Sequence, residues 1–198
     1  MKILLVTAAL AASILTPAAA TAQAIPGAVV AVVDLDRVTA ECTACKTAAA
    51  ALRGQVTSLQ TRAKTLGTPL QTEGKSIQTA IDALQGKEPD AALKTRVTAF
   101  ESKRQAAETE LQRGQQQVQR NQAYVSQQIQ QKLGPIYQQV MQKRGANLMV
   151  EVGTTLASGA ALDVTGDVLA ALNAQLPSVQ TTAPAAPAQP QQQQPQGR

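Results

Sequence analysis

The sequence has no His and no Trp, and its 198 residues include only one Phe and two Tyr. Large side chains supply most of the buried area of a compact core, so this chain must bury its surface in another way. Thin helical seams and association between subunits are the usual routes. The lack of His also removes the commonest general base, and we find no Gly-rich phosphate loop and no Ser motif of the hydrolase type. The composition therefore argues against an enzyme.

The N-terminus carries the longest apolar run. Residues 3–15 are mostly apolar, Lys2 precedes them and small residues follow at positions 18–24. The run is too short to span a bilayer as a retained anchor, and the pattern is typical of a secretory signal peptide. We expect residues 1–24 to be this signal, cleaved near Ala22 or Ala24, and the protein to be exported to a bacterial periplasm.

Charge is distributed unevenly along the chain. Residues 46–144 contain 15 Lys or Arg against 7 Asp or Glu, whereas the rest of the chain contains 3 basic and 6 acidic residues. A basic centre favours acidic or anionic partners. The alternative is an ordinary solvated helix face, and the charge pattern alone leaves both open.

The same central region has the period of a long helical hairpin. Apolar residues recur in heptads up to a cluster of helix breakers at residues 86–90, and the pattern resumes beyond it. The apolar positions of the first arm are Leu52, Val56, Leu59, Ala63, Leu66 and Leu70, followed by Ile77, Ile81 and Leu84. Two arms of similar length predict an antiparallel pair over residues 46–144.

Both arms contain residues that interrupt the pattern. Gly67, Pro69 and Gly74 predict a kink in the first arm, because an internal Pro removes a backbone donor and clashes with the preceding turn. In the second arm the helical spacing continues across Pro135 to Arg144, and a Gly follows as a stop.

The seam is the line of apolar heptad positions along which the two arms pack. In the second arm three of these positions carry residues other than the expected apolar ones, namely Arg104, Gly114 and Asn121. Antiparallel folding places Glu73 opposite residues 102–104. We therefore predict an ion pair of Glu73 with Lys103 or Arg104, of little energetic value if exposed.

The hairpin is flanked by the two parts of a small base, residues 25–45 and 145–176. Residues 28–33 form an apolar run that predicts a strand buried on both faces, and a helix follows with Asp36 or Thr39 as its N-cap. Residues 147–152 predict a second strand, and a short third strand is expected around residues 155–157.

The end of the chain has two further features. A terminal helix is expected over residues 166–173, with Thr165 as its cap. From residue 177 to residue 198 the composition changes to Pro, Ala, Gln and Thr, which predicts a disordered tail. The predicted fold class is thus α+β and mostly α, with the hairpin inserted between strand one and strand two.

This order of segments resembles the Skp/OmpH-like periplasmic chaperones. The specific pieces are the strand that ends at Asp34, the segment 147–151, and the closing Asp163-Val164-Thr165-x-Asp167-Val168-Leu169. The resemblance implies a homotrimer with a β-rich trimerisation body, from which coiled-coil hairpins hang around a cavity. It implies an ATP-independent holdase, without a cofactor, that binds unfolded outer-membrane proteins before membrane insertion.

The resemblance makes basic side chains of the arms candidates for contacting clients. They are Arg62, Lys64, Lys75, Lys87, Lys94, Arg96, Lys103 and Arg104. The same charge would suit contact with an anionic membrane surface or lipopolysaccharide.

The pair Cys42 and Cys45 carries the main chemical alternative. A C-x-x-C at a helix N-terminus can be a dithiol redox pair, but the βαβ context of a thioredoxin-like enzyme is missing. A zinc site would need ligands from another subunit. In an exported protein a disulfide or structural pair is favoured over an intersubunit contact, a redox site or a metal site.

Two further functions compete with a chaperone. Asp34, Asp36 and Glu41 form an acidic cluster, which is more typical of caps and a solvated turn than of an acid and base pair. Nucleic-acid binding is disfavoured by export and by the lack of aromatic residues for stacking. The stronger rival is a coiled-coil structural spacer or adaptor of the cell envelope.

Overall fold

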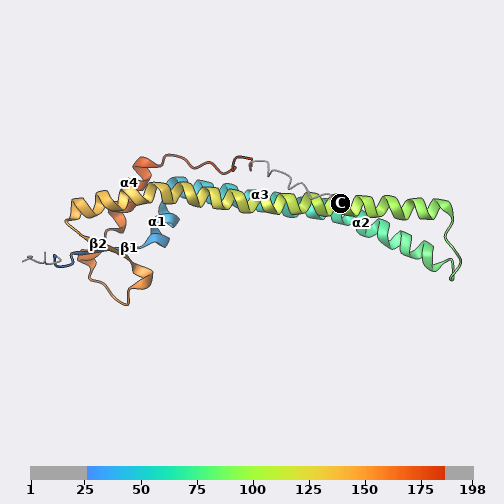
Figure 1. The fold of residues 1–198 in the computed structure, drawn as a ribbon, viewed down its shortest axis with the longest axis horizontal. Helices are drawn as coiled ribbons and strands as arrows, with labels where there is room; N and C mark the ends of the chain where they lie inside the picture. Colours follow the sequence, from blue (N-terminus) through green and yellow to red (C-terminus); the bar gives the residue numbers. More distant parts are fainter. Residues whose placement is uncertain (1–25, 186–198) are drawn as a thin grey trace, which may run out of the picture.

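A computed structural model describes residues 26–185 as a small base from which one long helical hairpin projects (Figure 1). The expected signal peptide and the last part of the expected tail, residues 186–198, lie outside the described residues. The element order places the whole hairpin between the two strands. The predicted fold class, α+β and mostly α with an inserted hairpin, is confirmed.

The two strands of the base pair in parallel. Strand β1 covers Val30–Val33 and strand β2 covers Leu148–Glu151, with Val30 opposite Leu148 and Val33 opposite Glu151. Ala31, Val32 and Val33 are all buried, as expected for an apolar run covered on both faces. A parallel pair needs a crossover connection, and here the hairpin itself forms it.

Helix α1, Leu35–Glu41, begins directly after β1, so the predicted N-caps are wrong. Asp34 is the N-cap, and its Oδ1 accepts a hydrogen bond from the Arg37 N–H at 2.8 Å. The residue that ends the strand already has the extended backbone that an N-cap needs. Thr39 lies inside the helix, where its hydroxyl donates to the Leu35 carbonyl.

The chain breaks its helical path at Cys42, which is the C-cap of α1 and the N-cap of α2. Cys42 and Cys45 form a disulfide across this junction, with their Cα atoms 5.2 Å apart. Helix α2 then covers Thr43–Asp82, and the disulfide therefore ties its first turn to the end of α1.

The hairpin consists of α2 and of α3, which covers Ala91–Arg144. Their 40 and 54 residues correspond to lengths of about 60 Å and about 80 Å. Between them Gln85 and Gly86 have φ values of 48° and 88°, and Asp90 caps α3 by accepting from the Leu93 N–H at 2.7 Å. The chain thus turns where the breaker cluster predicted it.

Both internal prolines lie within continuous helices, Pro69 in α2 and Pro135 in α3. The predicted kink region therefore does not interrupt the helical run of α2. Pro69 is exposed, so water can bond the carbonyl that the ring leaves without a donor. Gly145 has a φ of 67° and ends α3, which confirms the predicted stop.

The predicted third strand around residues 155–157 is wrong. The 3-10 helix η1, Val152–Thr154, follows β2 directly, and the hydroxyls of Thr154 and Thr155 both donate to the Glu151 carbonyl at 2.9 Å. Such local bonds favour a turn over a strand. Strand β1 instead makes an isolated bridge between Val32 and Asp163.

Helix α4, Thr165–Gln175, closes the base after the short 3-10 helix η2, Ala160–Leu162. Thr165 is its first residue, whereas the N-cap is Val164, so the predicted cap is off by one position. The Thr165 hydroxyl has a different role, because it accepts from the Asp34 N–H at 2.9 Å. It thereby joins the start of α4 to the end of β1.

The hydrophobic core lies in the base, where α1, the start of α2, the end of α3 and α4 meet. Val38, Ile136, Val168 and Leu172 are 0% exposed. The ends of α3 and α4 are also joined by charge, since Lys143 and Arg144 both pair with Asp167.

The prediction of a disordered tail does not hold for residues 177–185. This segment runs back along the hairpin, as the red-brown trace beside α3 in Figure 1. Val179 packs against the core, and side chains of α2 and α3 hydrogen-bond the backbone of the segment. The composition of a segment indicates how much apolar surface it can bury by itself. It does not indicate the hydrogen bonds and apolar contacts that a neighbouring helix can provide.

Candidate functional site

The seam between α2 and α3 is thinly packed. Between residues 49 and 132 only Ile77, Ala107, Asn121 and Val125 are buried. The heptad residues of the first arm are half-buried, among them Leu52, Leu59, Leu66 and Leu70. A lone two-helix hairpin leaves such residues at the border of the solvent, and the arm therefore presents a stripe of partly accessible apolar surface.

Two glycines bring the arms close together. A Cβ on Gly114 would lie 2.5 Å from Leu59 Cδ1, and one on Gly74 would lie 3.2 Å from Phe100 Cζ. These glycines provide space for a large side chain of the facing helix. Gly67 has no neighbour within 4 Å, so the lack of a side chain at this position serves no packing contact.

Ion pairs across the seam fix the register of the arms. Lys103 Nζ lies 3.0 Å from Glu73 Oε2, which confirms the predicted pairing for Lys103. Arg104 pairs on its own helix instead, with Glu101 and Glu108. Nearer the base, Arg62 binds both carboxylate oxygens of Glu110, at 2.6 and 3.1 Å.

The Arg62 hydrogen bond lowers the pKa of the Glu110 carboxyl from its ordinary value, and the same bond raises the pKa of Arg62. Both side chains are about half exposed. Exposed pairs of this kind contribute little to stability, and their value here is to set which residues face each other.

The structure divides the eight candidate basic residues into two groups. Arg62, Lys94, Lys103 and Arg104 are in ion pairs, and Arg96 donates to the Ser76 hydroxyl at 2.8 Å. Among residues 26–185, Lys64, Lys75 and Lys87 make no ion pair. These three exposed lysines are the best placed of the eight to meet an incoming anion.

The carboxylates of the arms are already engaged. Five of the seven are in ion pairs, Asp82 accepts from Gln78, and Asp90 caps α3. Nine of the fifteen basic residues between positions 46 and 144 have no carboxylate partner within the described chain. The arm surface is therefore positive after all local pairing.

The Cys pair offers little access for redox chemistry. Cys42 is 0% and Cys45 is 6% exposed, and their sulfur atoms are bonded to each other. Redox-active cysteines are typically low-pKa thiolates that solvent can reach. Within residues 26–185, no group of three or more His, Cys, Asp or Glu side chains is arranged to hold a metal ion.

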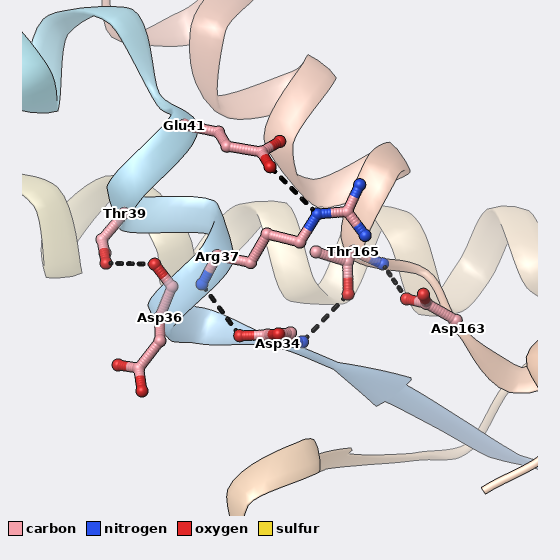
Figure 2. A network of polar contacts seen from close by, with 7 residues as sticks. All are labelled: Asp34, Asp36, Arg37, Thr39, Glu41, Asp163 and Thr165. Carbon is pink, nitrogen blue, oxygen red and sulfur yellow. Dashed lines mark hydrogen bonds and ion pairs between the residues drawn. The ribbon is translucent and has the colours of Figure 1, made fainter.

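The acidic cluster at the start of α1 is part of a structural network (Figure 2). Arg37 Nε lies 3.2 Å from Glu41 Oε1, while the Asp36 carboxylate points away from the other labelled residues. Thr165 hydrogen-bonds the Asp163 carboxyl and lowers its pKa from the ordinary value. A cavity of about 240 Å³ lies beside this network, lined by Asp34, Arg37 and Asp163 among others.

An uncovered apolar surface of the base was missed by the sequence reasoning. Five of the six large apolar residues that are exposed in the described chain lie in the base, namely Val29, Leu148, Val152, Leu156 and Leu162. In that part of the chain, β2 has no strand on its outer edge. Two-stranded sheets are marginal alone, and the apolar residues of the irregular segment 152–162 were the signal for this surface.

The second feature that sequence reasoning missed is a groove on the hairpin. It has a volume of about 700 Å³ and lies between α2 and α3, where Gln55, Leu59, Gly114 and Asn121 are among its lining residues. Asn121 is only 3% exposed. A polar residue at an apolar seam position was visible in the sequence, but not the amide groups that surround it.

None of the helices in the described residues combines the length and the apolar character that a membrane span requires.

Comparisons with known proteins agree with this architecture. The family model described as outer membrane protein (OmpH-like) matches residues 29–172. A crystal structure from Caulobacter crescentus CB15, described as that of a candidate outer membrane chaperone (OmpH-like), superposes with a TM-score of 0.67 and 21% identity, over 85% of this chain and 96% of that one. At this identity the likeness establishes the fold alone. The comparison with curated proteins gives no match.

Proposed function

Because this chain belongs to the family of OmpH-like outer membrane proteins, we propose that it is an ATP-independent holdase of the periplasm. It keeps unfolded outer-membrane proteins from aggregating before membrane insertion, and it needs neither a catalytic residue nor a cofactor. The observation that carries the proposal is the hairpin itself, a long arm that stays positive after local pairing and has a half-buried apolar seam.

The arm offers a client many weak contacts. Unpaired lysines such as Lys64, Lys75 and Lys87 attract acidic segments over a distance that salt shortens. The apolar stripe then supplies contacts that no single residue dominates. Such contacts retain a client only when several arms act together, as an avidity effect. The same charge would allow the arm to approach an anionic membrane surface or lipopolysaccharide.

Several arms require an oligomer, for which the base is suited. Five of its large apolar residues are exposed, and β2 has an unpaired strand edge. Exposed apolar surface is typical of association surfaces, and open strand edges pair readily with another chain. We therefore propose a homotrimer that is held at the base, with a client cavity between its three hairpins.

The second candidate is a structural spacer of the envelope, which the length of α3, about 80 Å, would also serve. A spacer does not need unpaired cations along its whole arm. A dithiol redox protein is a weaker alternative, because the disulfide between Cys42 and Cys45 is buried.

An aggregation assay separates these candidates. An outer-membrane β-barrel protein is diluted from urea, and light scattering is followed with and without near-stoichiometric amounts of this protein. A holdase suppresses the scattering, whereas a spacer does not. Lys64→Gln/Lys75→Gln/Lys87→Gln should suppress it less well, while the Arg triple variant at the same positions retains the charge and serves as the control. Failure of the wild-type protein at low salt, or a stable monomer in sedimentation, would contradict the proposal.

A further inference from the structure

The segment 177–185 is held on the hairpin by side-chain amides of α2 and α3. Gln128 Nε2 donates to the Gln180 carbonyl at 2.8 Å, and Gln128 Oε1 accepts from the Gln180 N–H at 3.0 Å. Gln55 Nε2 donates to the Thr181 carbonyl at 2.9 Å. The Ala183 N–H donates to Asn121 Oδ1 at 2.8 Å.

All four hydrogen bonds end on backbone groups of the segment. None of them uses a side chain of residues 177–185, so these four hydrogen bonds do not depend on the sequence of the segment, whereas Val179 adds an apolar contact with the core. The paired bonds of Gln128 have the form of a hydrogen-bonded residue pair in an antiparallel sheet, because a side-chain amide has the same donor and acceptor as a peptide group. The hairpin thus binds an extended backbone in the manner of a sheet edge.

The amides are positioned by bonds that do not involve the segment. Asn121 Nδ2 donates to Gln55 Oε1 at 2.8 Å, and Gln117 Nε2 donates to Asn121 Oδ1 at 2.7 Å. Gln128 Nε2 also donates to the Tyr124 carbonyl at 3.1 Å. These bonds satisfy the Asn121 amide without the segment, so we expect the groups to keep their orientation when the segment leaves.

The groove is longer than the part that the segment covers. Thr182 lines it at one point, and it continues along Ser58, Leu59 and Gly114 toward Arg62. An extended chain in this groove would therefore meet amides and then apolar side chains, up to the ion pair of Arg62 with Glu110. An unfolded outer-membrane protein offers partners to the amides and to the apolar side chains, because it is extended and alternates apolar and polar residues.

We propose that the amides of Gln55, Asn121 and Gln128 form a binding site for the backbone of an extended polypeptide, and that segment 177–185 occupies this site as an intramolecular competitor. The inference rests on the proposed function, since the polypeptide that displaces the segment is the unfolded client. Segment 177–185 occupies this site until a client replaces it.

Competition within one chain lowers the apparent affinity of the client. A site that is free for only about one-tenth of the time binds about tenfold more weakly than the free site. Releasing the segment should therefore strengthen client binding, whereas removing the amides should weaken it.

The test changes the segment and leaves the groove intact. Gln180→Pro/Ala183→Pro removes the two N–H groups that bond to Gln128 and Asn121, in a segment that already contains proline. Ser178→Pro is the matched control, because no hydrogen bond from its N–H is present in the described structure. The probe is a fluorescently labelled outer-membrane β-barrel protein diluted from urea, titrated with the full-length chain.

We expect the double variant to bind the probe roughly tenfold more tightly and the Ser178→Pro control to bind as the wild type does. Gln55→Ala/Gln128→Ala added to the double variant should cancel the gain, while Gln127→Ala added to it should preserve the gain. Hydrogen exchange by NMR gives an independent readout, since the Gln180 and Ala183 amides should be protected in the free protein and exposed in the client complex.

The two assays distinguish a failure of the proposed chaperone function from a failure of the backbone-binding site. If the wild-type protein does not suppress aggregation at all, the proposed function fails and the inference fails with it. If it suppresses aggregation but the double variant binds the probe no more tightly, or the two amides stay protected in the complex, the inference alone is overturned.

Discussion

The base and the hairpin differ in how they bury their side chains. In the base, Val38, Ile136, Val168 and Leu172 are 0% exposed, and helices from both halves of the chain surround them. In the hairpin, only four residues between positions 49 and 132 are buried. Stability is therefore concentrated where the chain must hold a fixed shape, and the arm is joined by contacts that cost little to open.

This contrast predicts unequal costs for equal deletions of apolar volume. Ile136→Ala should lower the free energy of unfolding by about 3 kcal/mol, because it leaves a cavity in a closed core. Leu66→Ala in the half-buried seam should cost about 1 kcal/mol or less. Chemical denaturation of both variants measures the difference, and equal costs would show that the hairpin is packed as tightly as the base.

The disulfide lies in the base, the more tightly packed of the two regions. Cys42→Ser/Cys45→Ser should lower the free energy of unfolding by about 2 kcal/mol, as expected for a very short closed loop. Client protection in the aggregation assay should persist below the unfolding transition, because the arms are not altered. A folded double variant that loses all client protection would instead favour a redox function of the pair.

The glycines of the arms provide a matched pair of substitutions. Gly114→Ala should destabilise the hairpin by about 1 to 2 kcal/mol, because its Cβ would overlap Leu59. Gly67→Ala meets no neighbour and should stabilise α2 by up to about 1 kcal/mol. Helical content followed by circular dichroism during thermal unfolding distinguishes them, and equal effects would refute the close approach at Gly114.

The Gly67→Ala variant also tests whether the arm must bend to enclose a client. A stiffer first arm should accommodate large outer-membrane clients less well than small ones. Capture of a large and a small β-barrel protein is compared in the same assay, and unchanged capture across sizes would contradict this expectation.

The smallest expected effect is on the pH dependence of the free energy of unfolding. Hydrogen bonds from Lys143 and Arg144 lower the pKa of the Asp167 carboxyl below its ordinary value of 3.8. A depressed pKa in the folded state contributes stability above the unfolded pKa, and this contribution is lost as the pH falls through the folded value. Asp167→Asn should therefore lose stability at neutral pH and show a shallower acid dependence than the wild type. Denaturation curves recorded at several acidic pH values give the free energy of unfolding of both proteins. An equal decrease of this free energy with falling pH would contradict the claim.

The sequence predicted the long-period features well. Heptads in residues 46–144 located both arms, and the breaker cluster located the turn, because these signals depend on local spacing. The Glu73 and Lys103 pair followed from antiparallel geometry alone. The third strand failed because the hydroxyls of Thr154 and Thr155 bond locally, which β-propensity does not measure.

The features that were missed depend on contacts far apart in the sequence. Asp34 was overlooked as a cap because it ends a strand, and the role of its N–H depends on Thr165 across the base. The order of residues 177–185 depends on Gln55, Asn121 and Gln128, and these amides do not stand out in helices that contain many Gln residues. A polar residue at a seam position, here Asn121, is the one sequence signal that pointed toward that groove.

The central claim is that positive, thinly packed arms capture unfolded outer-membrane proteins. The most direct test is the rate at which the protein associates with a urea-unfolded, labelled β-barrel protein, measured by stopped flow over a salt series. If unpaired arm cations steer capture, the rate should fall steadily as the salt concentration rises, and the Lys64→Gln/Lys75→Gln/Lys87→Gln variant should show a weaker salt dependence. A rate that is independent of salt, or the absence of association at low salt, would contradict the account.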